Sequence, residues 1–214
     1  ELIKIDDIKA KYVSADEVIA NCTAIKANKE YRQWIIGKDD DGNVIEDSLP
    51  YKLEVINRVL KGTPFTVSYR VMNELVILVA VILDKITEQG KELNDSVFKS
   101  TLDYALDRIL LMKILPRIEG DDDMFVVSDE EQKVNNLPAN ARDDSNYEYT
   151  KLDWLKDVCP QRKNKPASLE GNGDNEQRET QSVPEEYQDK YMAIDKLQEM
   201  IARLRRQNFT RFWP

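Results

Sequence analysis

Apolar residues recur along most of the chain at the spacing of helices, and no long stretch alternates apolar and polar residues as a half-buried strand does. Ser14 stands three residues before Glu17 and ahead of an apolar stripe at 18–25, which predicts a helix that begins with a capping box. Pro50 lies at a favoured first-turn position and opens a second predicted helix, which Gly62 ends.

The strongest helical pattern begins near Tyr69 and stops at Gly90. Its apolar residues cover most of the circumference, so we expect a central helix that is buried on several sides. A further helix is predicted over 96–115, where Pro116 ends it, and an amphipathic stripe over 191–204 predicts the last one. Together these patterns predict an all-α fold, a helical bundle followed by a linker and a C-terminal helix.

The chain changes character at Gly120, where a long polar stretch begins. We expect four segments. Residues 1–49 form a helical connecting segment and 50–120 a helical core. Residues 121–186 form a polar and partly disordered linker, and 187–214 a C-terminal amphipathic helix with an aromatic tail. Within the linker, 163–186 has almost no apolar residues and is typical of a disordered segment or a surface loop. The apolar island at 152–155 is expected to dock on the bundle.

The charge balance is acidic, because 40 Asp and Glu residues stand against 31 Lys and Arg, a formal net charge of -9. Neutralising phosphates requires a basic face, so this balance argues against a generic electrostatic DNA-binding protein. One local basic cluster lies near the C-terminus. This cluster consists of Arg203, Arg205, Arg206 and Arg211. It is a candidate contact for DNA or an acidic partner, and the alternative is that it is a solvated helix face.

Several chemistries are excluded by residues that the sequence lacks. The chain has no His, and therefore no His general base and no imidazole ligand for a metal. Cys22 and Cys159 are far apart, so neither a zinc site nor a disulfide framework is expected, and a reducing cytoplasm is the default compartment. The most apolar stretch, 75–83, is much shorter than the roughly 20 apolar residues that span a bilayer. We therefore expect a soluble cytoplasmic protein without a membrane contact.

Motifs that bind phosphate or metal are missing as well. The sequence has no GxxxxGK[ST] loop, because Lys61-Gly62-Thr63 lacks the upstream glycine. The acidic run at 38–43 fails as a calcium loop, since Gly37 and Ser48 would occupy positions that require carboxylates. A β-turn with Asp-Gly or Gly-Asn at its corner is expected instead. The sequence predicts no catalytic residue, no metal site and no cofactor within this chain.

Three phrases resemble the helical lid region of McrB-type AAA+ proteins. The first, at 65–75, contains Ser-Tyr-Arg-Val and is similar to a tyrosine-arginine-valine element that begins one lid helix in that family. The second, at 105–120, closes with Lys-Ile-Leu-Pro-Arg-Ile-Glu-Gly and is similar to a lys-x-leu-pro-arg-x-x-gly phrase. The third, at 196–213, ends in Asn-Phe-Thr-Arg-Phe-Trp and is similar to a gly-phe-thr-ser-phe-trp close. The chain departs from the family at three positions. Ser68 and Asn208 stand where the family commonly has glycine, and Glu119 stands where it commonly has histidine.

The resemblance covers roughly 50–120 and 187–214 and implies a role rather than a reaction within this chain. In AAA+ assemblies the lid closes over a nucleotide that the preceding α/β module holds, and neighbouring subunits share the site. The chain would be the non-catalytic lid and C-terminal subdomain of a GTP or ATP hydrolase that uses magnesium, forms an oligomeric ring and drives a nuclease partner on DNA. It would then be a fragment, or one piece of a split system.

Two arginines carry the contacts that the resemblance implies. Arg70 corresponds to the arginine that lids use to sense the terminal phosphate, which a guanidinium grips with two hydrogen bonds in a fixed fork. The alternative for Arg70 is a surface ion pair with Glu74, four residues later. Arg117 is a candidate contact to a neighbouring subunit, and its alternative is a cap on the negative end of its helix.

Two other classes of function are open on the sequence alone. A stand-alone helical protein-interaction module, without nucleotide contact, fits the complete helical core and the missing phosphate loop. An acidic mimic of DNA fits the net charge, but the acids are spread along the chain and interleaved with Lys and Arg, which disfavours it.

Overall fold

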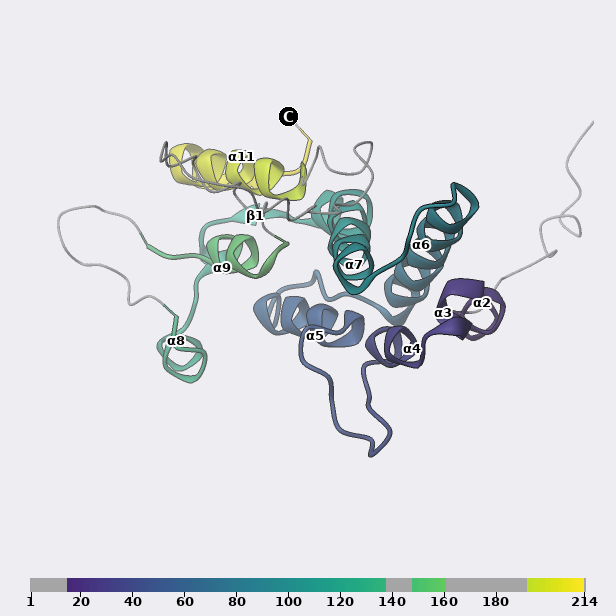
Figure 1. Cartoon of the computed structure of the whole chain (residues 1–214). Helices are drawn as coiled ribbons and strands as arrows, with labels where there is room; N and C mark the ends of the chain where they lie inside the picture. The colour runs from purple at the N-terminus through teal and green to yellow at the C-terminus, as the bar shows by residue number, and fades with distance from the viewer. Residues whose placement is uncertain (1–14, 138–147, 161–191, 214) are drawn as a thin grey trace, which may run out of the picture.

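The computed structural model describes residues 15–137, 148–160 and 192–213, and they are mostly helical, which confirms the all-α class (Figure 1). The helices in chain order are α2 (Ala15–Asn21), α3 (Thr23–Ala27), α4 (Lys29–Ile36), α5 (Leu49–Val59), α6 (Tyr69–Glu88), α7 (Asp95–Ile109), α8 (Asp129–Val134), α9 (Lys151–Val158) and α11 (Met192–Gln207). Shorter elements are the π-helical turn η1 (Leu110–Ile114), the 3-10 turns η2 (Leu115–Arg117) and η3 (Asp123–Phe125), and the strands β1 (Glu119–Asp121) and β2 (Phe209–Arg211).

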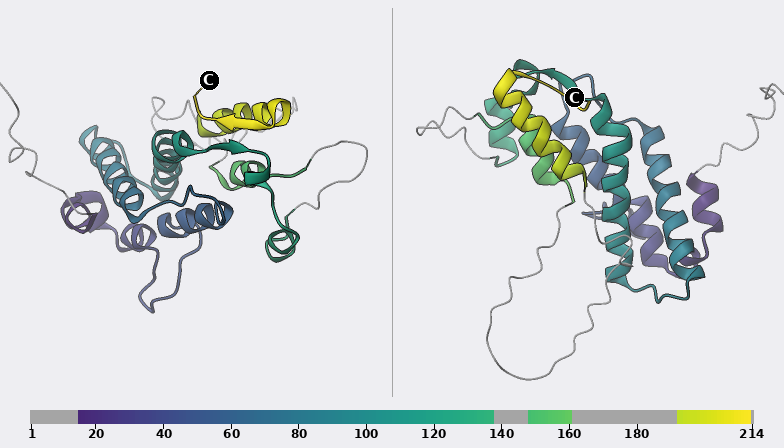
Figure 2. Two further views of the ribbon diagram at one scale, coloured as in Figure 1. Left: turned by 180° about the vertical axis from the view of Figure 1, so that it is seen from behind. Right: turned by 90° about the horizontal axis from the view of Figure 1, so that it is seen from above.

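The helix α6 is central, as its apolar circumference predicts. Leu75, Val79, Leu83 and Ile86 are fully buried, and each such side chain contributes about 1.5–3 kcal/mol by leaving water. One side of α6 packs on α7 and the other on α2 and α3, and Figure 2 shows α6 lying between them. The helix ends two residues before Gly90, whose φ of 68° is a left-handed conformation that glycine adopts without strain.

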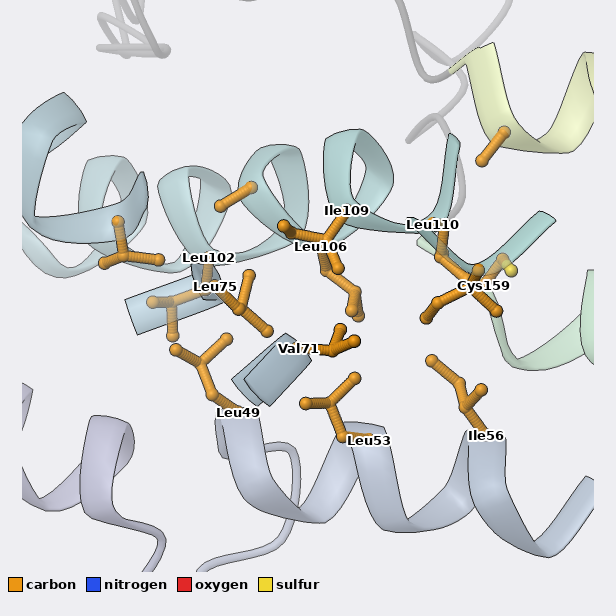
Figure 3. Close-up of a cluster of buried hydrophobic side chains, with 14 of the residues drawn as sticks. Leu49, Leu53, Ile56, Val71, Leu75, Leu102, Leu106, Ile109, Leu110 and Cys159 are labelled. Atoms are coloured by element: carbon orange, nitrogen blue, oxygen red, sulfur yellow. The ribbon is translucent and has the colours of Figure 1, made fainter. Parts of the chain in front are cut away.

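The helix α5 begins at Leu49 with Pro50 in its first turn, close to the predicted start. Its buried stripe of Leu53, Ile56 and Val59 faces the core. Figure 3 shows the labelled residues of this stripe opposite those of α6 and α7. Because residues three and four apart share one helical face, the spacing of the stripe determines which side of α5 is buried.

The N-terminal region differs from the predicted single helix. Its described part forms α2 and α3, which are separated at Cys22, where ψ is 117° and the backbone is extended. The predicted capping residue Ser14 lies outside the described residues. The acidic run after α4 is a β-turn, as expected: Asp39 Oδ1 accepts from the main-chain N–H of Asn43 at 2.8 Å, and Gly42 has a φ of 82°.

The helix α7 ends before the predicted stop at Pro116. Regular α-helical geometry ends at Ile109, and the chain continues through η1 and η2 into β1. A π-helical turn inserts an extra residue per turn and is rare, often lying at functional sites. The π-helical stretch is only five residues long, about one turn, so its different period leaves no recognisable pattern in the sequence.

The described portion of 121–186 contributes buried structure. The apolar island at 152–155 forms half of α9, where Leu152, Trp154 and Leu155 are buried, and α9 packs against α5 and α11. The expected docking of this island is therefore confirmed. The segment 163–186, predicted to be disordered or a surface loop, lies outside the described residues.

A two-stranded antiparallel ribbon joins the second and third phrases that resemble the AAA+ lid. Strands β1 and β2 pair with Glu119 opposite Arg211, Gly120 opposite Thr210 and Asp121 opposite Phe209. Strands of three residues are too short to show a period, so the sequence contains no strand pattern here. Asn208 links α11 to β2, and its φ of 54° is one that asparagine tolerates and glycine favours.

Candidate functional site

Arg70 lies in the first turn of α6 with an exposed side chain. No hydrogen bond or ion pair joins it to another of the described residues. The surface ion pair with Glu74 is not formed, because Lys113 Nζ lies 3.0 Å from Glu74 Oε2 instead. The positive end of the α6 dipole adds to the guanidinium charge, so an anion at this point would meet two favourable fields.

The ion pair between Glu74 and Lys113 connects the first two lid-like phrases. Glu74 lies one turn after Arg70 on α6, and Lys113 lies in η1, four residues before Arg117. Both side chains are partly exposed, so the pair orients its two segments more than it stabilises the fold. Arg117 is exposed in η2. Within the ranges that the structure describes, it has no ion pair.

An open apolar groove of about 530 Å³ runs beside the start of α6. Tyr69, the residue before Arg70, lies at this groove with 79% of its surface exposed, and Ile36 of α4 is 45% exposed. Met72 and Val76 of α6 and Pro50 and Leu53 of α5 supply most of the remaining apolar lining.

Asn57 shapes one wall of this groove. Its side chain accepts from the main-chain N–H of Val67 at 2.6 Å and donates to the oxygen of the same residue at 3.2 Å, which fixes the segment before α6 against α5. The groove has no pattern in the sequence, because its lining comes from helices far apart in the chain. The exposure of Ile36 and Tyr69 is seen only in the structure.

The predicted basic cluster is divided among several internal contacts. Arg203 donates to the main-chain oxygens of Arg211 at 2.7 Å and Trp213 at 3.0 Å, and to the Glu199 carboxylate at 2.6 Å. Arg205 donates to Asp153 of α9 at 3.1 Å. These contacts give two of the arginines clear structural roles.

The other two arginines of the cluster lie at the surface. Arg206 is exposed, and its Nε donates to the main-chain oxygen of Ala202 at 3.2 Å. Arg211 is exposed on β2, opposite Glu119. The cluster therefore consists of two arginines with partners on other segments, Arg203 and Arg205, and two that lie at the surface.

Asp107 is a buried carboxylate that no pattern in the sequence singles out. Its two oxygens accept from the main-chain N–H groups of Met192 at 3.2 Å and Ala193 at 2.9 Å, which caps the start of α11 from a distant helix. Burial raises the pKa of Asp107, although these two hydrogen bonds and nearby Arg108 act in the opposite direction.

Both cysteines are free and buried. Burial raises the pKa of Cys22 to about 11, and the Asp84 carboxylate, which accepts from its thiol at 3.3 Å, adds to the shift. Burial also raises the pKa of Cys159 well above the ordinary range. Thiols of this kind are poor nucleophiles and poor metal ligands.

The described part of the chain contains no group of three or more Cys, Asp or Glu residues placed to hold a metal ion. Among the helices described, none is both long and apolar enough to cross a membrane.

Comparison with known proteins gives a family without a function. Neither curated proteins nor solved structures contain a match to this chain. Residues 19–209 match the family described as Domain of unknown function (DUF8727). The matched region extends from α2 to the first residue of β2. The matched region includes all three lid-like phrases except the last residues of the third. This chain therefore belongs to the DUF8727 family.

Proposed function

We propose that this chain is the non-catalytic lid and C-terminal subdomain of a McrB-like AAA+ GTPase or ATPase, and that it couples nucleotide binding to oligomer assembly and DNA restriction. The observation that carries the proposal is that segments resembling the lid are in direct contact although they are far apart in sequence. Glu74 of the first phrase pairs with Lys113 of the second. Strand β1 of the second pairs with β2 of the third.

Arg70 is the residue through which the lid would contact nucleotide. Its exposed guanidinium is not engaged by a described neighbour and stands at the positive end of α6. This arrangement suits a contact to the terminal phosphate of GTP or ATP, whose magnesium would be held outside this chain. The nearby Glu74–Lys113 pair would keep Arg70 and Arg117 in fixed relation when the lid moves.

The partners follow from the same proposal. A preceding AAA+ α/β module would hold the nucleotide, and neighbouring subunits of a ring would meet this chain near Arg117. A nuclease subunit would be driven by the assembly, and DNA would be contacted indirectly. We do not propose direct DNA contact through Arg203 and Arg205, because both donate hydrogen bonds to other segments of this chain.

The test is nucleotide hydrolysis by the parent protein that contains this chain. Arg70→Ala is expected to lower the turnover of GTP or ATP by about 10²-fold, the usual cost of one donor to transition-state charge, with oligomer size unchanged by light scattering. Arg32→Ala, which removes an exposed arginine of α4, is the matched control and should hydrolyse nucleotide normally. Normal hydrolysis by the Arg70 variant would refute the sensor role.

The second candidate is a stand-alone protein-interaction module, which the apolar groove beside Tyr69 favours. This function predicts that Ile36→Ser or Tyr69→Ser weakens partner binding while Arg70→Ala has no effect on it. The lid function predicts that Arg70→Ala changes the nucleotide kinetics. The two sets of variants, measured side by side, therefore distinguish the candidates.

A further inference from the structure

The C-terminal tail presents exposed aromatic residues on an ordered backbone. Trp213 is 66% exposed and Phe209 is 43% exposed. Their backbone is held in place: β2 pairs with β1, Thr210 Oγ1 donates to the main-chain oxygen of Met200 at 2.8 Å, and Arg203 donates to the oxygen of Trp213. A side chain on a fixed backbone loses less entropy on binding than one on a loose tail.

The tail is also fixed through its aromatic side chains. Phe212 packs partly against the core, lies 4.8 Å from the Trp213 ring in an edge-to-face contact, and has Lys196 Nζ 4.9 Å from its ring centre. Phe212 thus attaches the tail to α11, and Trp213 is left pointing into solvent. Tryptophan is one of the residue types enriched among the few residues that supply most of the binding energy at protein interfaces.

Carboxylates lie beside Phe209. Asp121 lies directly across the ribbon from Phe209, and Asp122 and Asp123 follow it, all with exposed side chains. Glu119 is exposed on the same strand, opposite Arg211. Phe209 therefore has carboxylates beside it, and Arg211 follows two residues later on the same exposed face of β2. Met124, 37% exposed, adds to the apolar part of this surface.

We infer that this ribbon face is a docking surface for a protein segment that carries lysine or arginine beside apolar side chains. The apolar residues of the segment would cover Phe209 and Trp213, and its cations would meet the carboxylates at 119–123. Single-stranded nucleic acid also stacks on aromatics, but it requires a basic surround. Here four exposed carboxylates, at 119 and 121–123, stand against the three cations Arg117, Lys196 and Arg211, so the surround is not basic.

The test uses the complete chain and a synthetic amphipathic peptide of leucine and lysine, labelled for fluorescence anisotropy. The peptide is expected to bind the wild-type chain, with an affinity that falls as the salt concentration is raised. Its affinity for the Phe209→Ala/Trp213→Ala double variant should be at least ten-fold lower. Val44→Ala removes a comparably exposed apolar side chain far from the ribbon and should leave affinity unchanged. Equal thermal unfolding of all variants shows that the ribbon has not unfolded.

A second set of variants tests the charge component separately. Asp121→Asn, Asp122→Asn and Asp123→Asn, combined in one chain, keep the side-chain oxygens that accept local main-chain N–H groups. They are expected to reduce peptide affinity at least ten-fold without changing stability. Failure of the leucine-lysine peptide to bind, equal binding of a leucine-glutamate peptide, or tighter binding of oligothymidine would each overturn the inference.

Discussion

The guanidinium of Arg203 donates to the main-chain oxygen of Arg211 at 2.7 Å, so that a side chain of α11 occupies the outer edge of β2. The same guanidinium reaches the oxygen of Trp213 and the carboxylate of Glu199. Groups on the edge of a two-stranded ribbon are otherwise open to water or to another strand. Arg203 thereby connects the helix, the ribbon and the aromatic tail.

Replacing Arg203 with Ala should destabilise the protein by about 1–2 kcal/mol, because it removes hydrogen bonds to a charged donor that is mostly shielded from water. Urea unfolding measures the loss of stability, and hydrogen exchange should show faster exchange of the β2 amides. Arg206→Ala is the matched control, since Arg206 is exposed and bonds to Ala202 of its own helix. Equal stability of the two variants would contradict the structural role of Arg203.

Asp107 should be required for the start of α11. Asp107→Ala leaves the buried N–H of Ala193 without its acceptor, which costs about 1–2 kcal/mol in the free energy of unfolding. Asp107→Asn keeps one acceptor and should lose less stability. Urea unfolding of the two variants gives the order, and an Ala variant as stable as the Asn variant would show that the cap contributes nothing.

The raised pKa of Asp107 predicts the sign of a pH effect. Burial makes the folded state bind a proton at a higher pH than the unfolded chain does, so ionisation of Asp107 opposes folding above the folded pKa. As the pH falls from 7 toward 4, the wild type should therefore gain stability relative to Asp107→Asn. Urea unfolding curves across this pH range measure the difference in unfolding free energy between the wild type and Asp107→Asn. The contributions of the other titrating groups largely cancel in that difference. A relative loss of stability on acidification would have the wrong sign.

The Glu74–Lys113 pair should couple weakly. Both side chains are about one-third or more exposed, so water screens the attraction, and the expected coupling energy is about 0.2–1 kcal/mol. A double-mutant cycle with Glu74→Gln and Lys113→Met measures it by urea unfolding at low salt. High salt should reduce it. A coupling that is zero at low salt would show that the contact does not hold α6 to η1 in solution.

The two thiols should be inert in the folded protein. With a pKa of about 11, roughly one Cys22 thiol in a thousand is ionised at pH 8, and Cys159 is less ionised still. Reaction with a colorimetric disulfide reagent should be slow in native buffer and should reach both thiols after urea unfolding. Rapid reaction of either thiol in the native protein would contradict the burial of that cysteine.

The amino-acid sequence was sufficient to predict the all-α class of the fold and its main helices. The apolar stripes of α5, α6 and α11 predict which face of each is buried, because a helix in water must place its apolar side against a partner. Pro50 marks the start of α5, because its fixed φ suits the first turn of a helix. Gly90 marks the end of α6, because glycine adopts the left-handed conformation that follows many helices. The docking of α9 was foreseen for the same reason.

Only the tertiary structure decided how distant segments meet. The ribbon of β1 and β2 needs both strands present at once, and neither is long enough to leave a periodic pattern. Arg203 and Arg205 looked like one basic surface in sequence, but each is turned toward a different partner by the path of the chain. Asp107 caps a helix that begins far away in sequence. Local spacing records which side of a helix is apolar, whereas these contacts depend on how helices pack, which no single segment encodes.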